Sequence, residues 1–576
     1  MGKIVLCSKK DTLIKLQKHI CNFQISGNVN GNFGFLVTYS KLSLKTDNLY
    51  EDNNGNFVIG VGTYIYRGTI GKSALKRILE DTHKGNCLQN KILGSFCIVT
   101  YKCHIMNIYV DEASTYDIYY TLEDNNIILS NTYYHVASAI DSATIDETGL
   151  IENWLFHTID ATTPIKNVRK LMGTERLCFD NCTWNIISGA SYIPHSGTDI
   201  VEKTIELYKD LPHLFRHSGV FMTGGQDSRL SLSLLLALGM KPTLYYGIGN
   251  SSDTFTKKED LDIVNQIADN CNLDIKFMDW RISSDQNKDW NLQKYGELYS
   301  IYNLNTNIFK EFDSKIDADF VALGYFGEIY RTIEPIELYK HQNFTLDEFI
   351  DDLYLHSTSF LFSEKSYDIY RKKIKDQFYK ICEYRGIDPT CLTKNDFQKL
   401  NTIYRQRWDT QMNNFVNLYC YSFPIFGNKI LTDIVEQIPY QEKLHSKIII
   451  KCIQKFYPQL LDIPFYSHIN KKKLNRKTME LKDEYRFFII KEYVRPYIKN
   501  KFFMRLARNI YYALKRDKKG WTEISMQYKE KEQVQTQLDK IYVPNNLVDL
   551  NLAIHKLDSR YLKRLLLLAY LLNKLN

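Results

Sequence analysis

The chain has 576 residues, of which 44% are hydrophobic and 24% are charged, so it is a globular sequence long enough for about two to four domains. A formal net charge of +8 is small for this length and gives no argument for nucleic-acid binding. The twelve cysteines include no Cys-x-x-Cys pair, which argues against a zinc site or a disulfide framework and favours a reducing, cytoplasmic setting.

The sequence has no segment that reads as a targeting or membrane-spanning element. The apolar stretch at the N-terminus is too short for a signal peptide. The longest late apolar run, residues 565–572, is far shorter than the ~20 residues that cross a bilayer. We therefore expect no spanning segment.

Short strand-like segments separated by Gly, Asn and Asp turns occupy residues 30–140. We expect strands at 33–37, 57–61, 96–101, 106–110 and 127–129, and one amphipathic helix over 72–80. This pattern predicts the α+β class with mainly antiparallel strands.

Four phrases in this region, residues 62–67, 93–97, 109–120 and 128–130, resemble in the same order the N-terminal glutaminase domain of asparagine synthetases. The resemblance implies the αββα sandwich of N-terminal-nucleophile hydrolases. The family's nucleophile is a cysteine exposed as residue one, whereas Gly2 stands here and Cys7 lies within an expected strand. The Asn and Glu that grip glutamine are also missing from residues 62–64. We therefore expect a glutaminase-like domain without glutaminase activity, kept as a lid or docking surface.

From about residue 199 the pattern changes to alternating strands and helices. Strands are expected at 220–222, 243–246, 274–278 and 320–323, with a helix at 259–271. This alternation predicts a parallel sheet with helices on both faces, which binds ligands beyond the carboxyl ends of its strands.

The most informative segment is residues 219–229, in which an apolar strand runs through a Gly-Gly turn into an apolar helical pattern. Such a turn aims backbone N–H groups and the positive end of a helix dipole at one point, which suits phosphate. Asp227 adds a hard oxygen ligand for Mg²⁺. The simpler alternative is that Asp227 or Ser228 only caps the helix. The residues expected to bind nucleotide here are Thr223, Gly224, Gly225, Gln226, Asp227 and Ser228.

This segment resembles the pyrophosphate loop of the asparagine-synthetase-like, N-type ATP pyrophosphatases, which activate a carboxylate as its acyl-adenylate. The resemblance implies ATP and Mg²⁺. Residues 323–331 resemble the family's second loop, so Glu328 is implied as the metal ligand opposite Asp227, Gly324 as a nucleotide contact and Tyr325 as a catalytic residue at the acyl centre. Backbone at Gly247, after the second strand, is expected near the adenine.

The resemblance continues weakly over residues 405–464, where Gly427 replaces the family's aspartate. Family members place a catalytic lysine beyond this region, where it stabilises negative charge on the attacked adenylate. The candidates are Lys471, Lys472 and Lys473, although a lysine run is also typical of a solvated surface loop. The helix carrying Asp260 matches only in part, and an amphipathic helix covering the sheet explains it without any catalytic role.

The predicted boundaries are a glutaminase-like domain over 1–198, an ATP pyrophosphatase domain over 199–475 and a helical C-terminal extension over 476–576. Residues 484–515 alternate aromatic with basic side chains, which is typical of helices packed on a domain with a wet basic face. Peripheral contact with an anionic membrane through 484–515 is the alternative.

Together these resemblances imply an ATP-dependent carbon–nitrogen ligase. The expected partners are a small-molecule or glycan carboxylate, with a uronic acid of bacterial surface polysaccharide as first choice, and an amine or ammonia donor. Nucleic acid is not expected, and the oligomeric state stays open. Two alternatives remain, a macrolactam-forming cyclase similar to the lasso-peptide cyclases and a catalytically silent scaffold.

Overall fold

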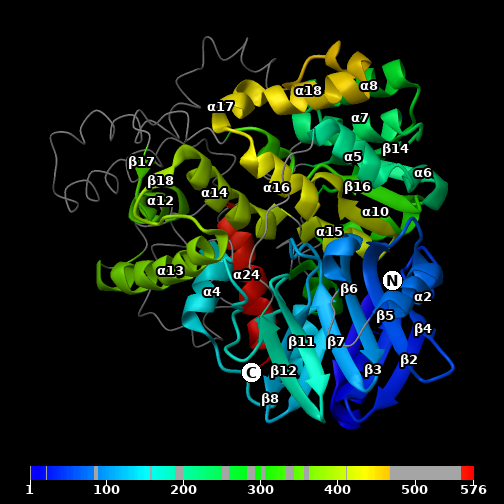
Figure 1. Ribbon diagram of the computed structural model, residues 1–576, viewed down its shortest axis with the longest axis vertical. Helices are drawn as coiled ribbons and strands as arrows, with labels where there is room; N and C mark the ends of the chain where they lie inside the picture. Colours follow the sequence, from blue (N-terminus) through cyan, green and yellow to red (C-terminus); the bar gives the residue numbers. More distant parts are fainter. Residues whose placement is uncertain are drawn as a thin grey trace.

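The computed structural model describes residues 2–20, 22–82, 88–155, 159–188, 199–249, 258–281, 292–299, 305–332, 343–355, 362, 364–409, 411–466 and 559–575. Two antiparallel sheets, in blue to cyan, occupy one end of the molecule in Figure 1, and a parallel sheet with green and yellow helices occupies the other. The structure thus combines antiparallel and parallel sheets, as the sequence predicts for its two halves.

The two antiparallel sheets have six strands each, in the orders β10-β8-β9-β1-β3-β2 and β12-β11-β7-β6-β5-β4. The strands are β1 (Lys3–Cys7), β2 (Ile25–Gly31), β3 (Gly34–Tyr39), β4 (Leu49–Glu51), β5 (Phe57–Ile65), β6 (Leu93–Lys102), β7 (Ile105–Val110), β8 (Tyr119–Glu123), β9 (Asn126–Ser130), β10 (Arg169–Lys170), β11 (Glu175–Asp180) and β12 (Thr183–Ser188). The five strands expected in this region appear as β3, β5, β6, β7 and β9.

Alternation along the strands builds four layers. In β1, Leu6 faces the core between the sheets, whereas Val5 packs with Leu16 of α1 (Lys10–Gln17) on the opposite face. In β5, Phe57 meets Phe33 between the sheets at a ring distance of 6.0 Å, while the other face packs on α2 (Gly71–Asp81). Helices therefore cover both outer faces of the paired sheets, and α2 confirms the helix expected at 72–80.

The parallel sheet has the strand order β15-β14-β13-β16-β19, and every neighbouring pair in it is parallel. Its strands are β13 (Ser218–Phe221), β14 (Thr243–Ile248), β15 (Ile275–Asp279), β16 (Phe320–Leu323) and β19 (Tyr421–Pro424). The four strands expected in this half are confirmed within two residues, and α8 (Lys258–Cys271) confirms the expected helix. β19 was not expected as a strand.

The remaining helices cover these sheets or form a helical region beside them (Figure 1). They are α3 (Tyr133–Ser138), α4 (Glu147–Leu155), α5 (Ile200–Tyr208), α6 (Leu211–Leu214), α7 (Gln226–Ala237), α9 (Leu292–Leu298), α10 (Asn307–Lys315), α12 (Leu346–Phe349), α13 (Glu364–Arg385), α14 (Lys394–Asp409), α15 (Gln411–Asn417), α16 (Lys429–Gln437), α17 (Tyr440–Lys443) and α18 (Lys447–Phe456). The shorter turns are η1 (Gln89–Lys91), η4 (Gly327–Tyr330), η5 (Ile350–Tyr354), η7 (Ile425–Gly427), η8 (Leu444–Ser446) and η9 (Pro458–Leu461), with a small ladder of β17 (Asn343–Phe344) and β18 (Leu392–Thr393).

The C-terminal helix α24 (Ser559–Asn573), red in Figure 1, is an internal element of the fold. Residues 565–572 are all buried, and they belong to the same hydrophobic cluster as α4 and α9. Trp154 of α4 donates its indole N–H to the carbonyl of Tyr561 at 2.9 Å. The C-terminal helix thus contacts α4 of the 1–198 region as well as α9 of the 199–475 region. Residues 484–515 lie outside the described residues.

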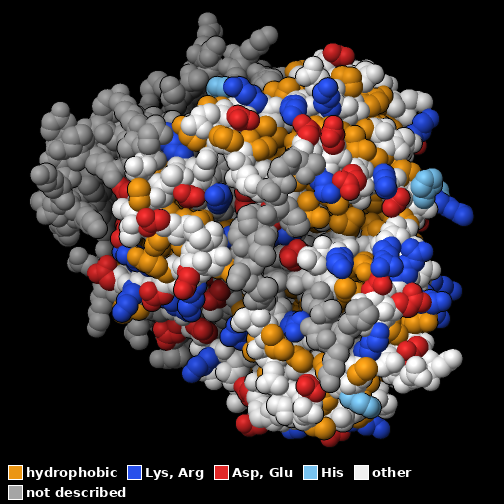
Figure 2. All heavy atoms as spheres, in the orientation of Figure 1, with side chains coloured by type: hydrophobic (Ala, Val, Ile, Leu, Met, Phe, Trp, Pro, Cys, Tyr) orange, Lys and Arg blue, Asp and Glu red, His pale blue; other side chains and the backbone are white. Residues whose placement is uncertain are grey.

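Within the part of the chain that the structure describes, no helix is long and apolar enough to cross a membrane. The face of the molecule shown in Figure 2 carries basic, acidic and hydrophobic side chains intermixed. This mixture agrees with a composition in which 74 basic residues nearly balance 66 acidic ones.

Candidate functional site

The Gly-Gly turn lies at the carboxyl end of β13, the central strand of the parallel sheet, and leads directly into α7. The N-cap of α7 is Gly225, which has no side chain to cap the helix. Asp227 and Ser228 lie inside the first turn of the helix, so the interpretation of either residue as the N-cap is wrong. The site is therefore placed where ligands bind in open parallel sheets.

Side chains hold the 223–228 loop (Thr223–Ser228) in shape. The Ser228 hydroxyl lies 3.0 Å from the Thr223 hydroxyl and accepts a hydrogen bond from the Thr223 N–H at 3.2 Å, and Gly225 donates its N–H to the Thr223 hydroxyl at 3.2 Å. Gly224 donates its N–H to Asp260 of α8 at 2.9 Å. The loop amides at 223–225 thus have protein partners, and the N–H groups of the first turn of α7 are the ones a helix leaves for an anion.

Asp260 fastens the loop to the sheet. Its second carboxylate oxygen accepts a hydrogen bond from the Tyr246 hydroxyl of β14 at 3.1 Å. The carboxylate thus bridges the loop backbone and a strand, a role that the sequence did not predict for this helix position.

Replacing Asp260 by alanine is expected to destabilise the protein by about 2 kcal/mol, because it removes two hydrogen bonds to a charged acceptor. The matched change at Asp262, an exposed residue of the same helix, is expected to cost no more than ~0.5 kcal/mol. Urea unfolding of both variants measures the difference. Equal free energies of unfolding would show that the bridge does not stabilise the loop.

The 324–328 loop, which follows β16, packs directly against the start of α7. A Cβ on Gly324 would lie 2.8 Å from the backbone nitrogen of Ser228, and a Cβ on Gly327 would lie 2.5 Å from the Asp227 side chain. Phe326 has a φ of 74°, a left-handed conformation that is strained for a bulky residue. Its buried ring lies against Gly427, where a Cβ would come within 2.9 Å of it. Glycine at 427 therefore makes room for this ring.

The two predicted metal ligands, Asp227 and Glu328, influence each other electrostatically. Burial raises the pKa of the Asp227 carboxyl, the Arg331 guanidinium opposes this shift, and the neighbouring negative charge of Glu328 adds to it. Arg331 donates to one Asp227 oxygen, Oδ2, at 3.2 Å. The other oxygen, Oδ1, is buried and has no hydrogen-bond partner among the described residues. An orphaned carboxylate oxygen that also feels the negative charge of a second carboxylate is an arrangement that a cation fits.

Mg²⁺ in nucleotide sites is usually bound by one or two carboxylates and completed by phosphate and water. Asp227 and Glu328 agree with this donor set. Within the described ranges no group of three or more His, Cys, Asp or Glu side chains could hold a metal ion by itself. The protein atoms at this site therefore fit a metal that arrives together with a phosphate ligand.

Gly247 and Tyr325, which were also predicted to lie at the site, pack closely against other residues. A Cβ on Gly247 would lie 2.4 Å from the indole ring of Trp280, whose backbone N–H donates to Ile248 at 2.7 Å. Gly247 is thus required by this packing, and any ligand contact there would use its backbone. Tyr325 is half-buried and packs against both large hydrophobic clusters, between the two glycines of its loop.

Arg229, the residue after the loop, anchors the end of the long described segment 411–466. Its side chain is fully buried, donates to the carbonyls of Leu460, Ile463 and Pro464 at 2.5–3.1 Å, and lies 4.2 Å from the centre of the Phe465 ring. The Tyr466 N–H then donates to the Gly224 carbonyl at 2.9 Å. Tyr466 therefore lies beside the 223–228 loop. The candidate lysines Lys471, Lys472 and Lys473 lie outside the described residues.

The start of the chain leaves little room for a reactive side chain. A Cβ on Gly2 would lie 2.8 Å from the carbonyl of Ser40 and 3.1 Å from the Phe23 ring. Next to it, the buried amine of Lys3 forms an ion pair with Glu297 and a hydrogen bond to Thr132. Cys7 is buried in β1, and burial raises the pKa of its thiol to about 12, which agrees with the interpretation of Cys7 as a small core residue.

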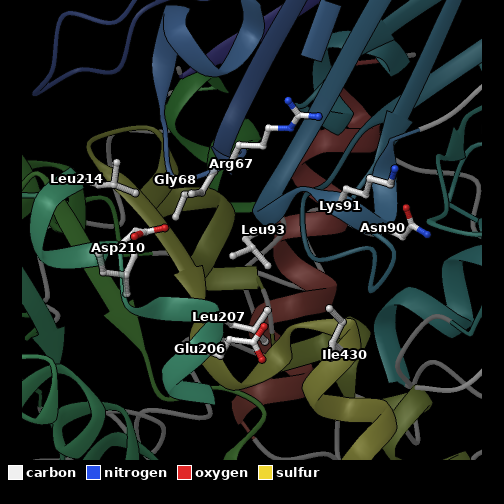
Figure 3. Close-up of a pocket in the computed structure, with 12 residues that line it drawn as sticks. Arg67, Gly68, Asn90, Lys91, Leu93, Glu206, Leu207, Asp210, Leu214 and Ile430 are labelled. Atoms are coloured by element: carbon white, nitrogen blue, oxygen red, sulfur yellow. The ribbon is translucent and has the colours of Figure 1, made fainter. Parts of the chain in front are cut away.

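A cleft of about 250 Å³ opens at the junction between the antiparallel sheets and the helices α5, α6 and α16 (Figure 3). Arg67 and Gly68, on the turn after β5, line it together with Asp210 and Leu214, and Gly68 lies next to Asp210. Leu214 precedes β13 in the chain, so this cleft lies at the amino-terminal edge of the parallel sheet. It is separate from the 223–228 loop, which lies at the carboxyl edge.

No protein-family profile and no curated protein match the chain. Among solved structures, a glutamine phosphoribosylpyrophosphate amidotransferase from B. subtilis, complexed with ADP and GMP, is similar with a TM-score of 0.23 and 9% identity, over 48% of this chain and 90% of that one. An allosteric regulatory enzyme of purine biosynthesis is similar with a TM-score of 0.23 and 8% identity, over 48% of this chain and 65% of that one. Likeness at this level supports no conclusion about activity.

Proposed function

We propose that this protein is an ATP-dependent carbon–nitrogen ligase that activates a carboxylate as its adenylate. The observation that carries the proposal is the Asp227 carboxylate in the first turn of α7, which has one buried oxygen without a partner among the described residues and feels the negative charge of Glu328. The close approach of Gly324 and Gly327 to this helix end also supports it, since only glycines allow the two loops to meet there.

In the proposed reaction the substrate carboxylate attacks the α-phosphorus of ATP and displaces pyrophosphate. The first-turn N–H groups of α7 bind the departing diphosphate. Asp227 and Glu328 would hold Mg²⁺, which would neutralise the negative charge that develops on the departing diphosphate. An amine then attacks the acyl carbon and displaces AMP, with Tyr325 orienting the nucleophile and a lysine among 471–473 stabilising the negative charge.

The proposed substrate is a sugar acid, with amidation of a uronic acid in bacterial surface polysaccharide as first choice and a cytoplasmic setting in which ATP is available. The nitrogen would come from ammonia, a partner enzyme or an amine on the substrate. An ¹⁸O experiment tests the adenylation step whichever amine the enzyme uses. If a carboxylate labelled with ¹⁸O is activated, one ¹⁸O appears in the AMP product. Mass spectrometry of AMP across a panel of labelled uronic acids and other carboxylates would identify the substrate, and AMP without label from every one of them would contradict the mechanism.

We propose further that the antiparallel-sheet region is a glutaminase-like domain without glutaminase activity. The crowding around Gly2 and the Lys3–Glu297 ion pair support this, because a side chain at position 2 would press against Ser40 and Phe23 and the neighbouring amine is already paired.

The purified protein is accordingly expected to release no glutamate from glutamine above the buffer blank, with or without ATP. A coupled glutamate dehydrogenase assay measures this. Release that scales with protein concentration and survives further purification would show that another nucleophile operates.

A silent scaffold is the second candidate, because the Gly224 amide is occupied by Asp260 and Asp227 is contacted by Arg331. Calorimetry with Mg²⁺ and ATP separates the two proposals. A ligase binds the nucleotide at the 223–228 loop, and substitutions in that loop abolish the binding. A scaffold gives no heat of binding.

A further inference from the structure

Arg331 occupies a position that the proposed reaction does not use. It follows η4, and its backbone carbonyl accepts a hydrogen bond from Gln398 at 2.9 Å, which fixes the start of its side chain. The side chain is 38% exposed and reaches back to Asp227. A cation therefore already lies on the predicted metal ligand.

The geometry of this contact differs from that of other Arg–Asp pairs in the molecule. Arg331 meets Asp227 through one nitrogen at 3.2 Å, longer than the ~2.7–2.9 Å usual for a charged pair. By contrast, Arg281 holds Asp279 with two nitrogens at 2.8 and 2.6 Å, and Arg371 holds Asp351 at 2.7 and 3.0 Å. The Arg331–Asp227 contact is single and long, so it is weaker than these two bidentate pairs.

The charge balance of the site changes when a metal binds. Asp227 and Glu328 carry two negative charges and Arg331 one positive charge, so the three side chains leave one negative charge. A divalent cation on the two carboxylates reverses the sign and makes the guanidinium unnecessary as their partner. Phosphate oxygens are then the acceptors to which a guanidinium binds best.

We propose that Arg331 is an exchangeable counter-ion, which neutralises the Asp227–Glu328 pair in the empty site and moves to a phosphate oxygen of the nucleotide when the metal takes its place. This inference rests on the proposed function, since it requires a metal-bound nucleotide at the 223–228 loop. It makes Arg331 a phosphate-binding residue that also keeps the empty carboxylates from capturing metal alone.

The proposed exchange predicts that replacing Arg331 changes the affinities for free metal and for nucleotide in opposite directions. In R331M, Mn²⁺ without nucleotide should bind about tenfold more tightly than in the wild type, because its competitor on Asp227 is gone. The same variant should bind ATP in the presence of Mg²⁺ about tenfold more weakly, because the phosphate contact is lost. R331K keeps the charge, so its affinity for Mn²⁺ alone should stay near the wild-type value.

Electron paramagnetic resonance of free Mn²⁺ and calorimetry with Mg²⁺ and ATP measure the two affinities on the full chain. The tighter Mn²⁺ binding of R331M should disappear in the double variant D227N/R331M. R67M, at a remote exposed arginine paired with Asp81, is the charge-matched control and should change neither affinity.

Four results would overturn the inference. Unchanged Mn²⁺ affinity in R331M shows that Arg331 does not compete with metal, and loss of both affinities together shows a merely structural role. ATP binding that is normal in the wild type and unchanged in R331M refutes the exchange but leaves the proposed function standing. Absence of ATP binding by the wild type refutes both.

Discussion

Replacing Asp227 by asparagine is expected to lower pyrophosphate release on the order of 10³-fold, equivalent to about 4 kcal/mol of transition-state stabilisation. The reason is that the carboxylate lies in the first turn of α7 with one buried oxygen left without a hydrogen-bond partner among the described residues, and an amide is a much weaker ligand for Mg²⁺. The readout is carboxylate-dependent pyrophosphate release, followed with a coupled pyrophosphatase. Asp269→Asn, an exposed change on α8, should retain wild-type rates.

The same substitution should leave the fold intact, which separates a chemical from a structural effect. Burial raises the pKa of Asp227 in the folded state, so its ionised form is disfavoured by folding. This carboxyl therefore contributes a stabilising free energy that is fully present below its unfolded-state pKa. That contribution is lost as the pH rises through its folded-state pKa. D227N should thus be as stable as the wild type at neutral pH, or slightly more stable. A large fall in its melting temperature would mean that the Arg331 contact holds the loop together.

The sequence predicted the parallel sheet and its loop well, because each of its signals is local. An apolar strand, two glycines and a helical pattern follow one another without interruption over residues 218–237, so no long-range information was needed to place them. No strand was predicted at β19, whose segment around Phe423 carries Pro424 and Gly427. Its place as a strand comes from pairing with β16, which lies a hundred residues earlier in the chain.

The contacts that shape the site were harder to predict than the site itself. Asp260 and Arg331 lie 33 and 104 positions from Asp227, and nothing in their local sequence says that they meet it or its loop. Arg229 could have been suspected, because a basic residue directly inside an apolar helical pattern is seldom buried without a purpose. Its acceptors, three carbonyls of the 460–464 segment, could not be read from the sequence.

The C-terminal helix gives the largest expected effect on stability. Leu567 of α24 is completely buried, and its neighbours from 565 to 572 are buried on every side of the helix. A helix that is apolar all round belongs to a core, and this one fills the space between α4 and α9. Replacing Leu567 by alanine should therefore cost about 2–5 kcal/mol, the loss seen when a buried leucine leaves a cavity. Leu42→Ala, at a leucine that is 37% exposed, should cost less than ~1 kcal/mol.

Deletion of residues 559–576 should have a still greater effect, because it uncovers the faces of α4 and α9 that α24 buries. We expect the truncated chain to be insoluble or to bind hydrophobic dyes, and to lose any ATP-dependent activity although no site residue is removed. Denaturant unfolding of L567A and L42A and the solubility of the truncated chain measure these effects. A truncated protein that unfolds at the wild-type denaturant concentration would show that α24 is a peripheral helix, and that the core of the molecule is complete without its last turns.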